Sequence, residues 1–293
     1  MAAPNEVCVV IGASRGLGAA IAAELARRDP ACPVLATMRG GPSPAAAGAD
    51  ADPSTSPADP PPPNLTPVPG IDISDDACVP ALRAAVGDRL IRTLIISAAA
   101  MDRDEGVRAG MDAAALAGVA SQFQANAVGP VRVAAALAGR IRPGGKLVLV
   151  ASRTGLPARI RAAGTGGMVG YRASKAAALA VSLILAADLA PQGVAVASIH
   201  PGTILTDMYR AWHGLQAGGG GAGGAGGAEE VKAGEAGGST QAPPPAAGVI
   251  APRTHAPVTP EVAASRLLDI VEAKVSLEAT GRVWDEEGVE MAF

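Results

Sequence analysis

Two side chains that can share a proton stand four positions apart in this sequence. Tyr171 and Lys175 lie in the stretch YRASKAAAL, residues 171–179, whose composition predicts a helix. Residues four apart lie on one face of a helix, and an ammonium beside a phenol favours the phenolate, which lowers a pKa that is normally about 10. A phenol tuned in this way can give a proton to a carbonyl oxygen or take one from an alcohol. Because the chain holds only 2 Tyr, a chance pairing is uncommon, and the pair predicts a general acid–base centre.

Two further polar residues could complete such a centre. Ser152 follows an apolar run that predicts a strand, and open α/β sheets place ligands at the carboxyl ends of their strands. Its hydroxyl could hydrogen-bond a substrate oxygen, or Ser152 could be a cap or loop residue. Asn126 ends a predicted helix, where it could belong to the helix C-terminus or hold a water that relays protons from Lys175.

A glycine-rich turn, GASRGLG over residues 12–18, follows the first apolar run and precedes a predicted helix. A strand, a glycine turn and a helix N-terminus together bind a diphosphate, because glycine lets the backbone come close and the helix dipole favours negative charge. In a chain with 37 glycines, the context gives this motif its weight. The turn predicts a dinucleotide site, with contacts from Gly12, Ser14, Arg15, Gly16, Leu17 and Gly18.

The end of the second predicted strand indicates which dinucleotide binds. NAD-preferring folds usually have an acidic residue there to bind the ribose 2′-hydroxyl, whereas this chain has Arg39. A guanidinium pairs with a 2′-phosphate in a bidentate way, and Arg15 could assist, so NADP(H) is predicted; the alternative is that Arg39 is a solvated strand-end charge. Asp72, beside Ile73, could accept a hydrogen bond from the adenine amino group or cap a helix that begins near Ser74.

Short apolar runs alternate with longer helix-like stretches along the chain. Such runs are typical of parallel strands that helices cover on both faces. The sequence therefore predicts an α/β fold, a doubly wound Rossmann-type domain with a mostly parallel sheet and helices on both faces. The predicted strands are 7–11, 33–38, 90–96, 146–150 and 194–199, and the predicted helices are 19–28, 113–126, 130–140, 174–189 and 260–274.

Two segments interrupt this alternation. Residues 40–69 are rich in Pro, Ala, Asp and Ser, and residues 214–257 are rich in Gly and Ala. Proline removes backbone donors and glycine is costly to order, so neither segment is expected to form a helix or strand. We interpret residues 1–293 as one domain with both segments as mobile loops inserted in it. The second could be an active-site lid, or either could be an insertion without function.

Composition narrows the class of protein. Hydrophobic residues make up 49% of the chain, which fits a globular protein and excludes a wholly disordered one. The net charge of −3 arises from 24 basic and 27 acidic residues without a basic stripe, so we expect no nucleic-acid or membrane partner.

The cysteines and the apolar runs bear on the compartment. Cys8, Cys32 and Cys78 match no metal or disulfide spacing, so we expect reduced, packed thiols and no metal. The first predicted strand leaves no room for a signal peptide. The longest uncharged apolar stretch, between Lys175 and Asp188, is shorter than the roughly 20 residues of a membrane span. These features predict a cytoplasmic protein.

Taken together, these motifs resemble the short-chain dehydrogenase/reductase family, and within it the C-factor/sniffer-like carbonyl reductases. The likeness extends over nearly the whole chain except the two segments of biased composition. The C-terminal GRVWD at 281–285 is similar to the last strand of that subfamily. The family's glycine motif is matched by Gly12, Gly16 and Gly18, and its catalytic tetrad is matched in order by Asn126, Ser152, Tyr171 and Lys175.

The resemblance also implies how a nicotinamide cofactor is held. The segment HPGT at 200–203, with TDM at 206–208, resembles the family's Pro-Gly turn, and Lys175 would hold ribose hydroxyls. One departure is SAA at 97–99, where the family usually has Asn-Ala-Gly, and it could weaken cofactor binding. Beyond the glycine turn, Arg39, Asp72 and Ile73, the cofactor contacts expected are Ala98, Tyr171, Lys175, Pro201, Gly202, Thr203 and Thr206.

Two functions remain open at this point. The first is an NADP(H)-dependent carbonyl reductase or alcohol dehydrogenase, and the second is a weak or inactive NADP(H)-binding regulatory protein on the same fold. The substrate is a small carbonyl or alcohol compound of unidentified structure, and Tyr209 and Trp212 could line its site or anchor the lid. The helix 174–189 is apolar nearly all round, which suggests a partner subunit, and the resemblance implies a homodimer or homotetramer.

Overall fold

The computed structural model describes residues 5–40, 60–102, 107, 110–213 and 256–292. Within these residues, seven parallel strands form one sheet in the order β3-β2-β1-β4-β5-β6-β7. The strands are β1 (Glu6–Ile11), β2 (Val34–Thr37), β3 (Leu65–Val68), β4 (Leu90–Ile96), β5 (Ile141–Val150), β6 (Ala195–Ile199) and β7 (Val283–Trp284).

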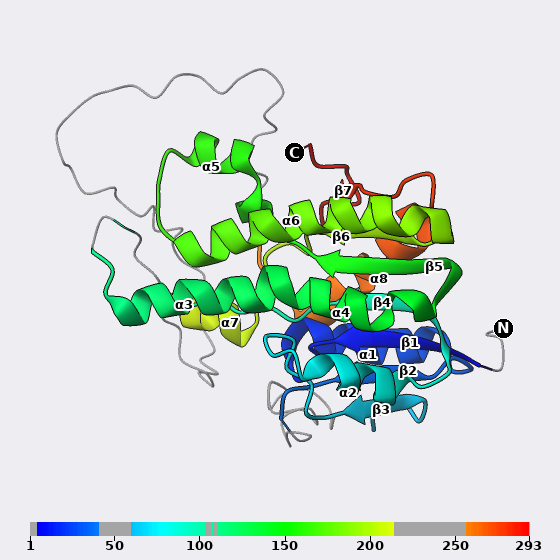
Figure 1. The fold of residues 1–293 in the computed structure, drawn as a ribbon. Coiled ribbons are helices and arrows are strands. Elements are labelled where there is room, and N and C mark those ends of the chain that lie inside the picture. The colour runs from blue at the N-terminus through cyan, green and yellow to red at the C-terminus, as the bar shows by residue number, and fades with distance from the viewer. Residues whose placement is uncertain (1–4, 41–59, 103–106, 108–109, 214–255, 293) are drawn as a thin grey trace, which may run out of the picture.

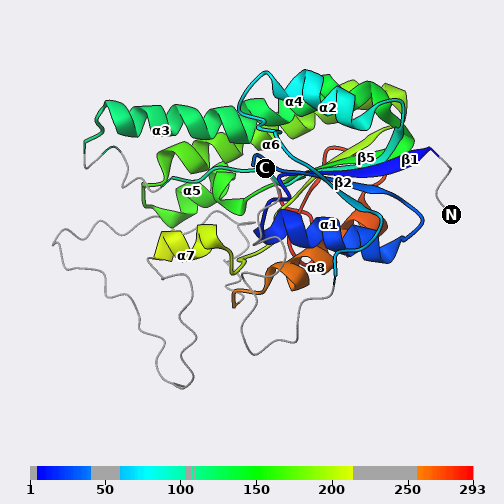
Figure 2. The same ribbon diagram turned by 90° about the horizontal axis from the view of Figure 1, so that it is seen from below.

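Helices cover both faces of this sheet (Figures 1 and 2). Helices α1 (Gly16–Arg28) and α8 (Pro260–Lys274) lie on one face. The opposite face is covered by α2 (Cys78–Val86), α3 (Ala113–Phe123), α4 (Gly129–Leu137) and α6 (Val169–Leu189). Short helices α5 (Pro157–Ala163) and α7 (Asp207–His213) lie beyond the carboxyl ends of the strands. The predicted doubly wound α/β fold is therefore confirmed.

The strands are apolar at successive positions because helices cover both faces of the sheet. In β1, Cys8 and Val10 face the core under α1 and α8, whereas Val7, Val9 and Ile11 face the core under α2 and α4. All five side chains are at most 1% exposed. Successive side chains of a strand point to opposite faces, so a strand covered on both sides needs apolar residues at every position.

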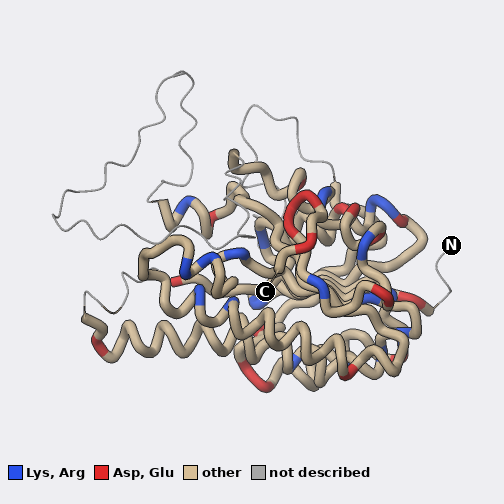
Figure 3. Tube along the Cα trace, turned by 90° about the horizontal axis from the view of Figure 1, so that it is seen from above, with Lys and Arg blue, Asp and Glu red and all other residues tan. Residues whose placement is uncertain are grey.

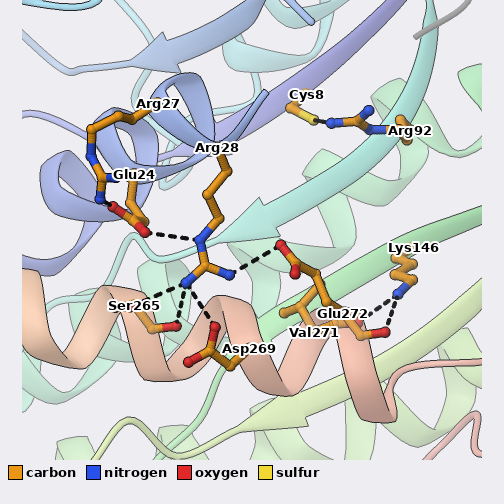
Figure 4. Close-up of polar contacts among 10 residues, drawn as sticks. All are labelled: Cys8, Glu24, Arg27, Arg28, Arg92, Lys146, Ser265, Asp269, Val271 and Glu272. Carbon is orange, nitrogen blue, oxygen red and sulfur yellow. Dashed lines mark hydrogen bonds and ion pairs between the residues drawn. The ribbon is translucent and has the colours of Figure 1, made fainter. Parts of the chain in front are cut away.

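Polar contacts fix the two helices on the first face against each other. The Arg28 guanidinium of α1 bonds Glu24 on its own helix and reaches Asp269 and Glu272 of α8, at 2.8 and 3.1 Å (Figure 4). It also donates to the backbone oxygen of Ser265 at 3.0 Å. Because Arg28 can donate in several directions at once, one side chain positions the helix that begins at the glycine turn.

The prediction that residues 40–69 contain no regular structure was wrong for Leu65–Val68. These four residues form edge strand β3, paired with β2 from Val34↔Leu65 to Thr37↔Val68. Pro67 is tolerated because the outer side of an edge strand needs no backbone donor. The turn before the strand is held by the Asn64 side-chain amide, which donates to the backbone oxygens of Ala26, Asp29 and Cys32. Residues 41–59 lie outside the described part of the chain.

Within the described ranges, one helix is long and apolar enough to cross a membrane by length and composition. It is the 24-residue stretch Val169–Gln192, which comprises α6 and the turn after it. The sequence-based expectation that no apolar stretch is long enough was wrong, because it counted only the uncharged residues between Lys175 and Asp188 and so underestimated the length of this helix. In the fold, α6 packs against β6, and its buried residues include Ser174, Ala178 and Ser182.

Candidate active site

The carboxyl ends of four neighbouring strands bring the candidate residues together. The glycine turn follows β1, Ala98 follows β4, Ser152 follows β5, and the turn at Pro201 and Gly202 follows β6. Helix α6 begins at Val169, earlier than expected, so that Tyr171 and Lys175 lie in its first two turns. Parallel strands place their carboxyl ends on one edge of the sheet, which is where such folds bind ligands.

Gly155, which the sequence did not single out, lets the Ser152 turn pack on α6. A Cβ at Gly155 would lie 2.7 Å from the backbone of Lys175 and Ala176. The turn 153–155 is closed by Ser152, whose hydroxyl accepts from the Thr154 amide and lies 2.8 Å from the Thr154 hydroxyl. This packing places the Ser152 hydroxyl close enough to the phenol of Tyr171 to lower the pKa of that phenol.

The pKa of Tyr171 differs from the expectation. Burial raises the pKa of the phenol above its ordinary value, and the Ser152 hydroxyl offsets only part of this rise. The Lys175 ammonium lies 5.8 Å from the centre of the Tyr171 ring, so it does not bring the phenol pKa below 10 as predicted. A phenol in this setting stays protonated at neutral pH, which suits a proton donor.

Lys175 is buried, and its ammonium group forms a hydrogen bond with a backbone oxygen. Its ammonium donates to the backbone oxygen of Val150 at 3.0 Å, and burial lowers the pKa of the amine to about 8. Lys175, Asn126 and Ala98 line a small internal cavity of about 10 Å³, which is roughly the space that one water molecule requires.

Asn126 does not end a helix, and that alternative was wrong. It lies in a π-helical turn, Gln124–Val128, that joins α3 to α4 without a break. Its side chain accepts from the Ala100 amide at 2.7 Å, donates to the Ala100 oxygen at 2.8 Å, and donates to the Ser174 hydroxyl at 2.9 Å. Asn126 thereby ties the segment after β4 to α6. These bonds anchor the SAA segment at 97–99, although it lacks the family's usual Asn.

The glycine turn is shaped by two close approaches that only glycine permits. A Cβ at Gly12, where φ is +85°, would lie 2.6 Å from Ala98. A Cβ at Gly18 would lie 2.0 Å from the Gly12 oxygen. Helix α1 then starts after Arg15 without a side-chain cap and without an acidic residue in its first turn. The first backbone amides of α1 are therefore available to bind a phosphate, and no acidic side chain in the first turn repels it.

The residues expected around the adenosine end fall into three situations. Arg39 is exposed at the end of β2, with no ion pair inside the described ranges. Arg15 pairs with Asp207 of α7 at 2.8 Å, so its charge is engaged. Asp72 accepts from both the amide and the hydroxyl of Ser74, which fits the turn-capping alternative, although helix α2 begins only at Cys78.

The pKa of Asp72 reflects these neighbours. Burial raises it, but the two hydrogen bonds from Ser74 and the nearby charge of Arg39 outweigh burial, and the pKa ends below its usual value. Arg39 and Asp72 are therefore close enough to interact across the space at the end of β2.

The remaining candidate residues lie around the same edge of the sheet, at the carboxyl ends of the strands. Leu17 and Ile73 are buried, and Ile73 packs under Gly129 of α4. Thr206 accepts from the Tyr209 amide at the start of α7, and Thr203 accepts from the Val258 amide. Trp212 and Tyr209 lie on α7, where the Tyr209 ring stacks on His213. The expected lid comprises residues 214–257, of which 214–255 lie outside the described part of the chain.

An ion pair that local sequence could not reveal connects two of these turns. Arg153, next to Ser152, forms a two-pronged contact with the buried carboxylate of Glu286, which is 133 positions away. Glu286 also packs against Gly202, where a Cβ would lie 3.3 Å from its own Cβ. It lies 3.8 Å from His200 as well. Burial and the charges of Arg153, Arg159 and Lys175 lower the pKa of His200 to about 3, so this imidazole is neutral.

Comparison with known proteins yields consistent matches. The sequence profile of the family described as short chain dehydrogenase matches residues 6–214. A 1-hydroxy-2-glutathionyl-2-methyl-3-butene dehydrogenase from Rhodococcus sp. is 29% identical over 208 residues, which cover 70% of this chain and 81% of that protein. The C-signal protein of Myxococcus xanthus is 38% identical over 94 residues, which cover 31% of this chain and 55% of that protein.

Solved structures show the same fold. A short-chain dehydrogenase/reductase from Burkholderia multivorans with bound NADP superposes with a TM-score of 0.68 at 22% identity, covering 99% of this chain and 100% of that one. The carbonyl reductase Sniffer of D. melanogaster superposes with a TM-score of 0.66 at 18% identity, with the same coverage.

Proposed function

The chain belongs to the short-chain dehydrogenase family, and we propose that it is an NADP(H)-dependent oxidoreductase that interconverts a carbonyl compound and its alcohol, as a carbonyl reductase does. The observation that carries the proposal is that the Ser152 hydroxyl and the buried Lys175 both lie beside the phenol of Tyr171, at the sheet edge that the glycine turn also occupies. A protonated phenol and a second hydroxyl directed at one place can together bind and protonate a carbonyl oxygen.

The residues present fit a dinucleotide. Gly12 and Gly18 remove the side chains that would fill the turn, and the uncapped start of α1 offers amides to a diphosphate. Arg39 offers an exposed guanidinium at the end of β2, where a 2′-phosphate would need one. When bound, the nicotinamide supplies or accepts the hydride.

The protein side chains have separate tasks in this proposal. Tyr171 gives a proton to the substrate oxygen in reduction and takes one in oxidation. Ser152 donates a hydrogen bond to the same oxygen and stabilises its developing charge. Lys175 provides a positive charge next to the phenol. Asn126 and Lys175 border the same water-sized cavity, which supports a water, held by Asn126, that relays protons from Lys175 toward solvent.

The second candidate function, a weakly active or inactive regulatory protein, is favoured by the SAA segment at 97–99. The likeness to C-signal over 94 residues is compatible with it. Against it stand the two bonds by which Asn126 holds Ala100, because they keep this segment in place without the family's usual Asn. Oxidation of NADPH by any aldehyde, ketone or quinone from a panel separates the two functions, since the regulatory protein would bind NADPH without turnover.

The preference for NADPH is expected to depend on Arg39. Replacing Arg39 by Ala should weaken NADPH binding about 10- to 100-fold, because hydrogen bonds to a charged group contribute about 1.5–3 kcal/mol and about 1.4 kcal/mol corresponds to tenfold. Binding of NADH, which lacks the 2′-phosphate, should stay within about twofold. Fluorescence titration of both nucleotides measures the difference.

Arg140→Ala is a matched control for this change, since Arg140 is an exposed arginine that pairs with Asp88 at the far end of β5. It should leave both affinities unchanged. Equal losses of NADPH and NADH affinity in Arg39→Ala would contradict the assignment of Arg39 to the 2′-phosphate.

We further propose that the chain acts in the cytoplasm as a homo-oligomer. Its three cysteines are free, as suits a reducing compartment. The helix layer formed by α3, α4 and α6 carries little charge, and α3 shows none along its length (Figure 3). Four large apolar residues of this layer and Val128 in the π turn between α3 and α4 are more than a third exposed; the four are Leu116, Val131, Leu183 and Ile184. A partner subunit would cover them.

Replacing Ile184, which is 60% exposed, by Asp should convert a dimer or tetramer into smaller species, because a buried unpaired charge opposes association. Light scattering coupled to size-exclusion chromatography measures the mass. Val107→Asp, a change at a comparably exposed apolar residue outside these helices, should leave the mass unaltered. A monomeric wild type would refute the oligomer.

A further inference from the structure

Two thiols meet at the amino edge of the sheet, at the opposite end of β1 from the glycine turn. Cys8 lies in β1, Cys32 lies in the turn between α1 and β2, and their sulfur atoms are 3.7 Å apart. Both residues are 1% exposed. The Cys8 amide donates to the Pro33 oxygen at 2.9 Å, so the two backbones are direct neighbours. The sulfurs are therefore in contact before any bond joins them.

A guanidinium lies against one of these sulfurs. Arg92 of β4 reaches Cys8 Sγ with Nη2 at 3.6 Å (Figure 4). Its Nη1 pairs with Asp29 at 2.6 Å. The Arg92 and Asp29 side chains are 25% and 27% exposed, so solvent lies one side chain away from the buried thiols. A positive charge beside a sulfur favours the thiolate, which is the nucleophilic form.

The two thiols are electrostatically unequal. The hydrogen bond from Cys32 lowers the pKa of Cys8 most, burial opposes it, and the charge and hydrogen bond of Arg92 together with a hydrogen bond from Thr93 bring it to about 7. The pKa of Cys32 is raised by its bond to Cys8, by burial and by Asp29, although Arg92 opposes the rise. Cys8 is thus the more readily ionised of the two thiols near neutral pH. The Cys32 thiol can donate to the Cys8 sulfur or to the Pro33 oxygen, which lies 3.6 Å from its own sulfur.

We propose that Cys8 and Cys32 form a peroxide-reactive dithiol, in which Cys8 is the attacking sulfur and Cys32 the resolving one. The Cys8 thiolate attacks one oxygen of hydrogen peroxide, the O–O bond breaks, and the released hydroxide takes a proton to become water, leaving a sulfenic acid on Cys8. Cys32 then loses its proton and attacks the Cys8 sulfur, which forms the disulfide and expels hydroxide that leaves as a second water. Both sulfurs are oxidised and one peroxide is reduced to two waters.

Cys78 serves as an internal comparison. It is buried at the start of α2, and burial raises the pKa of its thiol. Arg132 lowers this pKa, but burial and the charges of three nearby aspartates outweigh it. Among the residues that the structure describes, no other cysteine forms a contact with Cys78 that could resolve it. The proposal therefore predicts which two of the three thiols react.

The test is a mass measurement on the intact protein after brief exposure to hydrogen peroxide at pH 7. Wild type and Cys78→Ser should lose two thiols and about 2 Da, and dithiothreitol should restore both. Cys32→Ser should instead hold a sulfenic acid on Cys8 that dimedone traps, and Cys8→Ser should not react on this timescale. Preferential oxidation of Cys78, or gain of oxygen by wild type without disulfide formation, would overturn the proposal.

The rate and the pH midpoint of the peroxide reaction test the role of Arg92. Arg92→Met should slow the peroxide reaction at pH 7 about tenfold and move its pH midpoint from near 7 toward the ordinary thiol pKa of about 8.5. Arg92→Lys should restore part of the rate, which a merely structural role would not predict. Circular dichroism spectra verify that both variants fold, and Arg140→Met serves as the control. An unchanged midpoint in Arg92→Met would remove Arg92 from the site.

Discussion

Tyr171→Phe is expected to lower kcat/KM for carbonyl reduction by about 10³-fold, because general acid catalysis by a positioned side chain contributes about 10²- to 10⁴-fold. The change removes only the phenol oxygen, which lies beside Ser152, and leaves the ring at the start of α6. NADPH affinity should stay within about threefold of wild type, so the loss should fall on kcat. Steady-state oxidation of NADPH with the best substrate from the carbonyl panel gives both parameters.

Tyr209→Phe is the matched control, since the chain has only 2 Tyr and Tyr209 lies on α7, where it stacks on His213. It should retain most of the activity. Ser152→Ala should fall between the two, with a loss of about 10²- to 10³-fold, as is typical for removal of one hydrogen bond to a developing oxyanion. Turnover by Tyr171→Phe at the wild-type rate would exclude Tyr171 as the proton donor and, with it, the proposed mechanism.

Gly18→Ala is expected to weaken NADPH binding by up to about 100-fold. The new Cβ would lie 2.0 Å from the Gly12 oxygen. Gly12 cannot retreat easily, because its amide bonds the Thr37 hydroxyl at 3.1 Å and its Cα faces Ala98. Overpacking of this kind costs about 1–3 kcal/mol, and the upper value corresponds to about 100-fold in affinity. The turn must shift, and the phosphate-binding amides shift with it.

Gly139→Ala is the control, because a Cβ added at Gly139 would meet no atom within 4 Å and its φ is not positive. Thermal melting of both variants without nucleotide separates a loss of folding from a loss of binding. Gly18→Ala should remain folded at the titration temperature and bind NADPH poorly, whereas Gly139→Ala should bind it as wild type does. Equal affinity in the two variants would contradict a diphosphate site at this turn.

Much of this fold could be predicted from the sequence because the signals are local. The alternation of β1, α1, β2 and β4 follows from the spacing of apolar residues within each element, and each strand is apolar throughout because helices cover both of its faces. Tyr171 and Lys175 share one helix, so their spacing alone placed them together. The glycine turn is likewise a property of seven consecutive residues, 12–18.

Where the sequence-based predictions failed, the cause was an environment that distant residues create. Leu65–Val68 was assigned to a loop, since a four-residue, half-exposed strand that contains Pro becomes a strand only when β2 lies beside it. Asn126 was placed at a helix end, because the π turn that buries it depends on Ala100 and Ser174.

The sequence by itself therefore determined the α/β class, the glycine turn and the tyrosine–lysine pair, because each rests on residues close together in the chain. Only the tertiary structure decided the electrostatics: it raised the pKa of Tyr171, joined Arg153 to Glu286 and set Cys8 against Cys32 and Arg92. The physical reason is that a pKa depends on desolvation and on charges in space, and both depend on how strands and helices far apart in the sequence pack together.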